Sequence, residues 1–108
     1  DAYTVKSNFI TSKNIVGKIL VFDRNKIPNC KVKIVLIENA DPGYDFIFTY
    51  NIKGLITKYG GSNSHMAIRC LELGIASIIG VGEEKFNTIK SCNKINLNCE
   101  QKFFRIIN

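Results

Sequence analysis

Hydrophobic and polar positions follow two different periods along this chain, and together they predict short strands separated by helices. Short apolar runs rich in β-branched residues are typical of buried strands, whereas apolar residues three and four positions apart are typical of a helix packed on one face. On this basis we expect strands at 15–22, 31–37, 54–57, 75–81, 95–97 and 103–107, and helices at 44–50, 65–74 and 83–91. The mixture places the chain in the α/β class.

The segment Gly54–Gly82 predicts one strand–helix–strand unit around the only histidine of the chain, His65. The Gly-Gly pair at 60–61 interrupts the apolar run, and glycine permits positive φ and close backbone approach. Ser64 is a residue type that caps helix N-termini, and Gly74 is a type that ends helices. We therefore expect His65 in the first helical turn, at the carboxyl end of a buried strand, where ligands bind in open α/β sheets.

This placement of His65 predicts phosphate chemistry. Backbone N–H groups at a helix N-terminus lack helical partners and attract anions. The same field disfavours the imidazolium form, so we expect a neutral ring with one nitrogen free to act as a nucleophile. Arg69, one turn further along, can face the same side and bind a phosphoryl oxygen. The alternative is a surface histidine beside an ordinary glycine turn.

The motif GLITKYGGSNSHMAIRCLELGIASIIGVG at 54–82 resembles the phosphohistidine signature of the PEP-utilising enzymes. In that signature a strand and Gly-Gly are followed by Ser-His, a helix and a Leu-Gly-Ile strand. The family includes phosphoenolpyruvate synthase and pyruvate phosphate dikinase, and its histidine domain also occurs in sugar-phosphotransferase enzyme I, glucan dikinases and rifampin phosphotransferase. The resemblance is closest over Asp41–Glu83. It implies a swivelling β/β/α phosphohistidine domain, with a central sheet layer and helices packed on it.

Carried over to this sequence, the resemblance makes His65 the catalytic residue that becomes phosphorylated. It assigns Gly60, Gly61 and Ser64 to the turn that presents His65, and we assign phosphate stabilisation to these three residues and to Arg69. No residue is assigned to a metal.

The sequence departs from the usual family pattern at three positions. The family commonly has threonine, arginine and proline where this chain has Asn63, Leu71 and Ala76. Regulation through a phosphorylated threonine is therefore not expected here. Whether Arg69, two positions before Leu71, substitutes for the family arginine stays open. Loss of the proline affects the strand entry and leaves the chemistry untouched.

The resemblance also implies the function. We expect His65 to take a phosphoryl group from ATP bound in an ATP-grasp neighbour, and to swing and deliver it to pyruvate or another acceptor. The chain would be one domain of a dikinase-type phosphotransferase, and its partners would be a nucleotide-binding domain and an acceptor domain. Mg²⁺ and ATP are expected in those neighbours, because this chain has no dense carboxylate cluster. A non-catalytic anion-binding or interaction module and a free-standing carrier working in trans are the alternatives.

Polar residues near the expected site have ordinary interpretations. Asp41 precedes Pro-Gly and Asp45 lies near the start of a helix, so we expect them to serve a turn and a cap rather than catalysis. At most, Asp41 or Tyr44 would contact the phosphate site indirectly. Lys58 and Tyr59 are expected to be solvated loop side chains.

The length of 108 residues allows one core, too small to hold nucleotide and pyruvate domains as well. Residues 1–14 are mostly polar and predict a lead-in or linker, so we place the phosphohistidine domain at 15–108. Because the chain begins at Asp1 without methionine, we expect it to be a domain excised from a longer multidomain chain.

Charge, cysteine content and hydropathy argue against several classes of protein. The net charge of +6 comes from scattered lysines rather than a basic stripe, so nucleic-acid binding is not expected. Four irregularly spaced cysteines and one histidine do not form a zinc motif, and we expect reduced thiols. No segment approaches the roughly twenty apolar residues that span a bilayer, and no signal peptide precedes the domain, so we expect a cytoplasmic protein without membrane contact.

Overall fold

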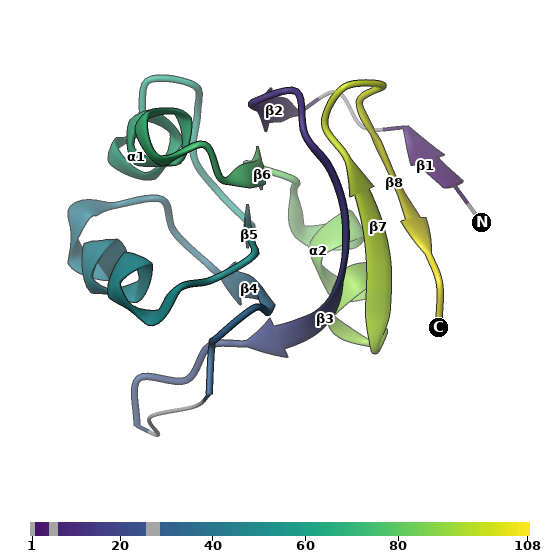
Figure 1. The fold of residues 1–108 in the computed structure, drawn as a ribbon, viewed down its shortest axis with the longest axis horizontal. Helices are drawn as coiled ribbons and strands as arrows, with labels where there is room; N and C mark the ends of the chain where they lie inside the picture. The colour runs from purple at the N-terminus through teal and green to yellow at the C-terminus, as the bar shows by residue number, and fades with distance from the viewer. Residues whose placement is uncertain (1, 5–6, 26–28) are drawn as a thin grey trace.

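The strands of the chain form one eight-stranded mixed sheet, in the order β1-β8-β7-β3-β4-β5-β6-β2 (Figure 1). The computed structural model describes residues 2–4, 7–25 and 29–108. Within these residues the strands are β1 (Ala2–Thr4), β2 (Asn8–Ile10), β3 (Asn14–Val21), β4 (Ile34–Ile37), β5 (Gly54–Thr57), β6 (Ala76–Ile79), β7 (Lys94–Asn98) and β8 (Phe103–Ile106). The helical elements are the 3₁₀ helix η1 (Pro42–Tyr50) and the α-helices α1 (His65–Leu73) and α2 (Glu83–Lys90). The α/β class predicted from the sequence is confirmed.

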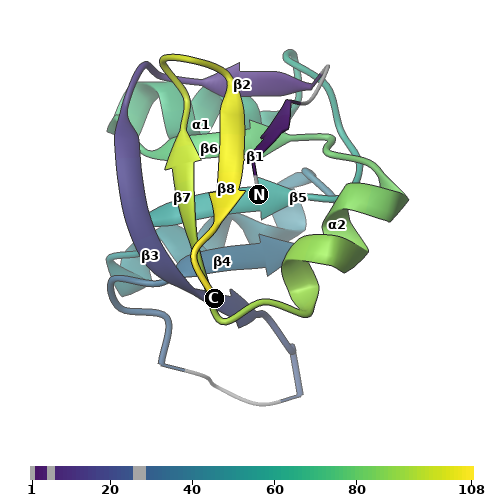
Figure 2. The same ribbon diagram turned by 90° about the vertical axis from the view of Figure 1, so that its right-hand side faces the viewer.

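The long strand β3 joins two halves of this sheet. Its residues 14–18 pair antiparallel with β7, and its residues 19–21 pair parallel with β4. The strands β4, β5 and β6 continue the parallel arrangement. Figure 2 shows the β7–β8 half in front of the β4–β6 half, with the strands of the two halves crossing. The sheet therefore folds over at β3 and encloses a core between its halves.

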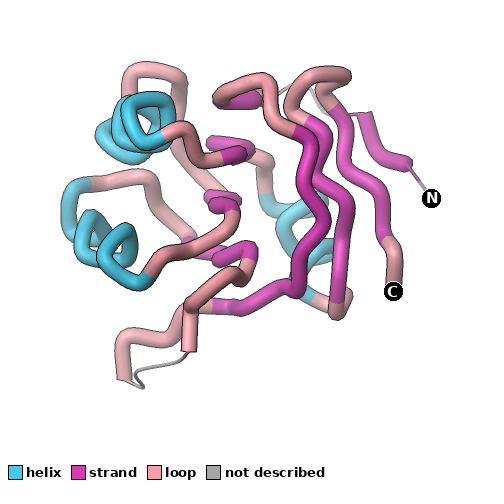
Figure 3. The backbone as a smooth tube through the Cα atoms, in the orientation of Figure 1, coloured by secondary structure: helices cyan, strands magenta, loops and turns pink. Residues whose placement is uncertain are grey.

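Two clusters of buried side chains, one on each face of β4–β6, hold the layers together. Along β4, Ile34 and Leu36 belong to the cluster between the sheet halves, whereas Val35 and Ile37 belong to the cluster under η1 and α1. The first cluster also contains residues of α2, β7 and β8. Figure 3 shows η1 and α1 on the outer face of β4–β6. Because both faces are covered, β4 is apolar along its whole length, as buried parallel strands usually are.

The described part of the predicted lead-in belongs to the sheet. β1 pairs with β8 and β2 pairs with β6, so the segment supplies both edge strands. Phe9 packs against the core between the sheet halves, and Ile10 packs against the cluster under the helices. The segment was expected to be a mostly polar lead-in or linker, and its described residues instead contribute two strands to the sheet. Asp1 and residues 5–6 lie outside the described residues.

Other elements also differ in their bounds from the sequence prediction, and the strand expected at 75–81 covers only Ala76–Ile79. The strand expected at 31–37 begins only at Ile34, because residues 31–33 turn: Val32 has a φ of 53° and its N–H donates to the carbonyl oxygen of Asn51. The helix expected at 44–50 lies inside η1, which starts earlier, at Pro42. Proline suits a first helical position because its missing N–H would have no helical partner there.

The two α-helices are short and end as their sequences predict. Gly74 closes α1 with a φ of 69°, and its N–H donates to carbonyl oxygens of the last turn. α2 begins with two glutamates and ends with Lys90, a charge order that suits the helix dipole. Among the described residues, no helix combines the length and the apolar character that crossing a bilayer requires.

All four cysteines are free thiols. Cys30, Cys70 and Cys99 are buried and Cys92 is partly buried. Burial disfavours the thiolate and raises the pKa of Cys70 and of Cys99 to about 11. Cys70 is therefore a protonated core residue at neutral pH, which agrees with its position on the inner face of α1.

Candidate functional site

The first turn of α1 lies at the carboxyl edge of the parallel strands. His65 is its first residue, and Ser64 is its N-cap. The Ser64 hydroxyl accepts from the Ala67 N–H at 3.4 Å and donates to the Gly61 carbonyl oxygen at 2.6 Å. Ser64 therefore ties the glycine turn to the helix, and this fixes the position from which His65 projects.

The two glycines before Ser64 differ in their structural roles. Gly60 has a φ of 129°, and a Cβ at this position would lie 2.6 Å from the Ala40 Cβ. Gly61 has no positive φ, and a Cβ there would meet nothing within 4 Å. Gly80 also approaches the turn closely, because a Cβ on it would lie 2.2 Å from the Gly60 carbonyl oxygen. The close approach expected of the Gly-Gly pair therefore belongs to Gly60.

Three backbone N–H groups at the start of α1 have partners. Met66 N–H donates to the Ala40 carbonyl oxygen at 3.3 Å, and Ala67 N–H donates to Ser64. Ile68 N–H closes the first turn on the Ser64 carbonyl oxygen. The expectation of free N–H groups is therefore corrected at Met66 and Ala67, and the Met66 bond shows that the segment after β4 packs onto the helix start.

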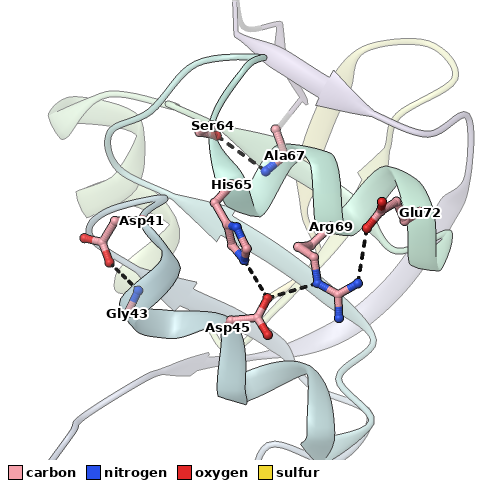
Figure 4. Close-up of polar contacts among 8 residues, drawn as sticks. All are labelled: Asp41, Gly43, Asp45, Ser64, His65, Ala67, Arg69 and Glu72. Carbon is pink, nitrogen blue, oxygen red and sulfur yellow. Dashed lines mark hydrogen bonds and ion pairs between the residues drawn. The ribbon is translucent and has the colours of Figure 1, made fainter.

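Three side chains meet beside the helix start, as Figure 4 shows. His65 Nε2 lies 2.7 Å from Asp45 Oδ1, and Arg69 Nε donates to the same oxygen at 3.0 Å. Arg69 Nη1 also donates to Glu72 Oε1 at 3.2 Å. The exposed fractions of the His65, Asp45 and Arg69 side chains are 35%, 41% and 33%. The cluster is thus open to solvent and to another molecule.

The contacts fix the proton arrangement of this cluster. Hydrogen bonds from His65 and Arg69, in that order of size, hold the pKa of Asp45 below its usual 3.8. Contact with Asp45, and then with Glu72, raises the pKa of Arg69 above its usual value. Asp45 is therefore ionised at neutral pH, and its Oδ1 accepts a hydrogen bond from the Nε2–H of His65. In a neutral ring held this way, the lone pair is on Nδ1.

We expect the carboxyl carbon of Asp45 to titrate below 3.8 in an NMR experiment on the chain. The pKa of Asp45 is lower in the folded than in the unfolded chain, so ionised Asp45 stabilises the fold at pH values above its unfolded-state pKa. This stabilisation is lost as the pH falls through the folded-state pKa. His65→Gln should move the midpoint upward, since His65 makes the larger contribution. An unchanged midpoint in His65→Gln, with Asn63→Ala as the control, would contradict the assignment.

Sequence reasoning missed the role of Asp45. Asp41 does behave as expected, since its Oδ1 accepts from the Gly43 N–H at 2.9 Å and caps η1. Asp45 points instead across to α1, and its partner His65 is 20 positions away in the sequence. No local signal identifies such a contact, because it depends on how η1 and α1 lie side by side on the sheet.

Other residues considered from the sequence lie apart from this cluster. The Lys58 ammonium is 5.4 Å from the centre of the Tyr59 ring, and half of Tyr59 is exposed. Tyr44 packs under the Arg24 guanidinium, which lies 4.1 Å from its ring centre. Leu71, at the place of the family arginine, is 65% exposed. Of these side chains, none has a described hydrogen bond to His65.

A separate cavity of about 430 Å³ lies at the carboxyl ends of β3 and β4. Phe22, Arg24, Tyr44 and Phe86 contribute to its walls, whereas His65 does not. In the described part of the chain, no three His, Cys, Asp or Glu side chains gather as a metal site would require.

Comparison with known proteins identifies the family. Residues 30–102 match the PEP-utilising enzyme, mobile domain family. The chain is 30% identical over 74 residues to rifampicin phosphotransferase from Bacillus cereus; the match covers 68% of this chain and 8% of that protein. Its fold is similar to the solution NMR structure of a UPF0107 protein, with a TM-score of 0.74, 14% identity and complete coverage of both chains. The family predicted from the histidine motif is confirmed, and this chain belongs to the mobile-domain family of the PEP-utilising enzymes.

Proposed function

We propose that this chain is the phosphoryl-carrier domain of a PEP-utilising phosphotransferase, and that His65 is the residue that carries the phosphoryl group. The observation that carries the proposal is the position of the single histidine. In a chain of this family, His65 projects from the start of α1 with a third of its side chain exposed, and Arg69 lies on the same face of the helix.

In this mechanism a nitrogen of the His65 ring attacks phosphorus. A nitrogen–phosphorus bond forms, the phosphorus–oxygen bond to the donor breaks, and the leaving oxygen takes the electron pair. Delivery reverses these events on an acceptor oxygen, so one difficult transfer becomes two easier ones. Arg69 binds a phosphoryl oxygen in both steps. Mg²⁺ and ATP, held by neighbouring domains, would supply charge neutralisation and the donor group.

The carrier role requires partner domains, and the rifampicin phosphotransferase that this chain matches is long enough to contain them. The chain spans 8% of the rifampicin phosphotransferase that it matches. We place an ATP-grasp nucleotide domain and an acceptor domain in the same polypeptide, with a swivelling movement of this domain between them. Pyruvate is one acceptor that fits this scheme. The name of the relative suggests that an organic acceptor of another class is equally compatible with this domain.

Labelling of the full-length protein tests this proposal. We expect ATP or phosphoenolpyruvate to add one phosphoryl group that is labile in acid and stable in base, and a peptide map to place it on His65. The donor that labels the protein identifies the first half-reaction. If neither donor produces an adduct on folded protein, the proposal fails, and a non-catalytic anion-binding module becomes the better description.

A further inference from the structure

One carboxylate oxygen of Asp45 accepts hydrogen bonds from both His65 and Arg69. Asp45 Oδ1 accepts from His65 Nε2 at 2.7 Å and from Arg69 Nε at 3.0 Å (Figure 4). An imidazole nitrogen and a guanidinium that converge on one point define a position where an anionic oxygen is stabilised. A phosphoryl group bonded to Nε2 would place an oxygen in this same space. Asp45 therefore occupies the position that a phosphoryl oxygen on Nε2 would take.

We propose that Asp45 is a built-in competitor of the phosphoryl group, which holds His65 and Arg69 in a resting arrangement and must be displaced when His65 is phosphorylated. This inference rests on the proposed carrier function of His65. Asp45 has a route for displacement, because its side chain is 41% exposed and comes from a different element, η1. Arg69 would then exchange the carboxylate oxygen for a phosphoryl oxygen, while its contact with Glu72 can persist.

The choice of Nε2 follows from Arg69. Arg69 points to the Nε2 side of the ring, since it and Nε2 share one acceptor. A phosphoryl group on Nδ1 would leave the Asp45 contacts intact and would not use this guanidinium. A group on Nε2 would meet the Arg69 charge directly. It would also meet the negative charge of Asp45, and this repulsion favours release of the carboxylate.

The chemical step begins when the Nε2–H bond to Asp45 opens. The ring proton on Nε2 passes to solvent and solvent gives a proton to Nδ1, so the ring changes to the tautomer that has its lone pair on Nε2. The Nε2 lone pair then forms the bond to phosphorus, and the electron pair of the broken bond goes to the leaving group. The resting contact disfavours this step in two ways, because it keeps the proton on Nε2 and fills the space beside it.

Phosphoramidate, a small phosphoryl donor that needs no partner domain, tests the inference on the 108-residue chain. The variants are Asp45→Asn and, as the matched control, Glu72→Gln. Both remove one negative charge next to Arg69 without changing side-chain size, but only Asp45 contacts His65. We expect Asp45→Asn to be phosphorylated about twofold to fivefold faster than the native chain, the range that an exposed ion pair can account for. Glu72→Gln should remain close to the native rate.

NMR identifies the nitrogen, because the chain has a single imidazole. We expect Nε2–H in the unmodified native chain and phosphorus on Nε2 afterwards. Slower or equal phosphorylation of Asp45→Asn overturns the inference, and so does an adduct on Nδ1. The inference also fails if phosphoramidate labels neither the native chain nor Asp45→Asn while both are folded, since Asp45 would then not be what limits the reaction. This assay is independent of ATP and phosphoenolpyruvate, so failure of the carrier function in the full-length protein is a separate result.

Discussion

Replacing His65 by glutamine should lower phosphotransfer by the full-length protein by at least about a thousandfold, because glutamine cannot form the covalent intermediate. The domain should remain folded. His65 is partly exposed, and the residues that anchor the start of α1 are its neighbours: Ser64 caps the helix, and Met66 is buried and donates its N–H to Ala40. The substitution therefore removes the nucleophile and leaves the helix in place.

Single-turnover transfer with a labelled donor measures the effect of His65→Gln, and thermal unfolding of the domain measures its stability. Asn63→Ala is the matched control, because Asn63 is an exposed residue of the same turn at the position of the family threonine. It should retain activity near the native level. Transfer that persists in His65→Gln at a native-like rate would remove His65 from the mechanism, and loss of transfer together with unfolding would point to a structural role.

Local signals predicted the elements around the site well. The short apolar run of β5, the cap at Ser64 and the helix end at Gly74 are each decided by residues within one turn of the position concerned. Their physical causes are buried apolar surface, an N–H that needs an acceptor, and a left-handed backbone conformation that favours glycine. Such causes can be recognised in a sequence without knowledge of the remaining fold.

Features that depend on tertiary packing could not be predicted in this way. The edge strand β2 has three residues, and its partner β6 follows about 70 positions later, as the bond from Asn8 to Ile79 illustrates. The helix start of α1 is occupied by the Ala40 carbonyl oxygen, which comes from the segment after β4. The Asp45 contact likewise depends on two elements lying side by side. The histidine was therefore predictable, whereas its partner was not.

The glycine turn provides the second large effect. Gly60→Ala should destabilise the domain by about 2–4 kcal/mol, the sum expected for backbone strain and overpacking. The φ of 129° is one that residues with a Cβ rarely adopt, and the new methyl would lie 2.6 Å from the Ala40 Cβ and 3.2 Å from Ile79. Gly61→Ala is the control within the same pair. It meets no neighbouring atom within 4 Å, and its stability should change by less than about 1 kcal/mol.

Urea unfolding separates the two causes in Gly60→Ala. The midpoint should fall in this variant, with little change in the slope, and stay near the native value in Gly61→Ala. Adding Ala40→Gly removes the methyl that Gly60→Ala would meet and leaves the backbone strain, so the double variant should be less destabilised than the sum of the two single variants predicts. Equal midpoints for the two alanine variants would show that the turn tolerates side chains at both positions.

The Ala40 carbonyl oxygen also accepts the Met66 N–H, so a displacement of Ala40 by Gly60→Ala should be transmitted to the start of α1. We therefore expect phosphorylation of His65 by phosphoramidate to be slower in Gly60→Ala and unchanged in Gly61→Ala.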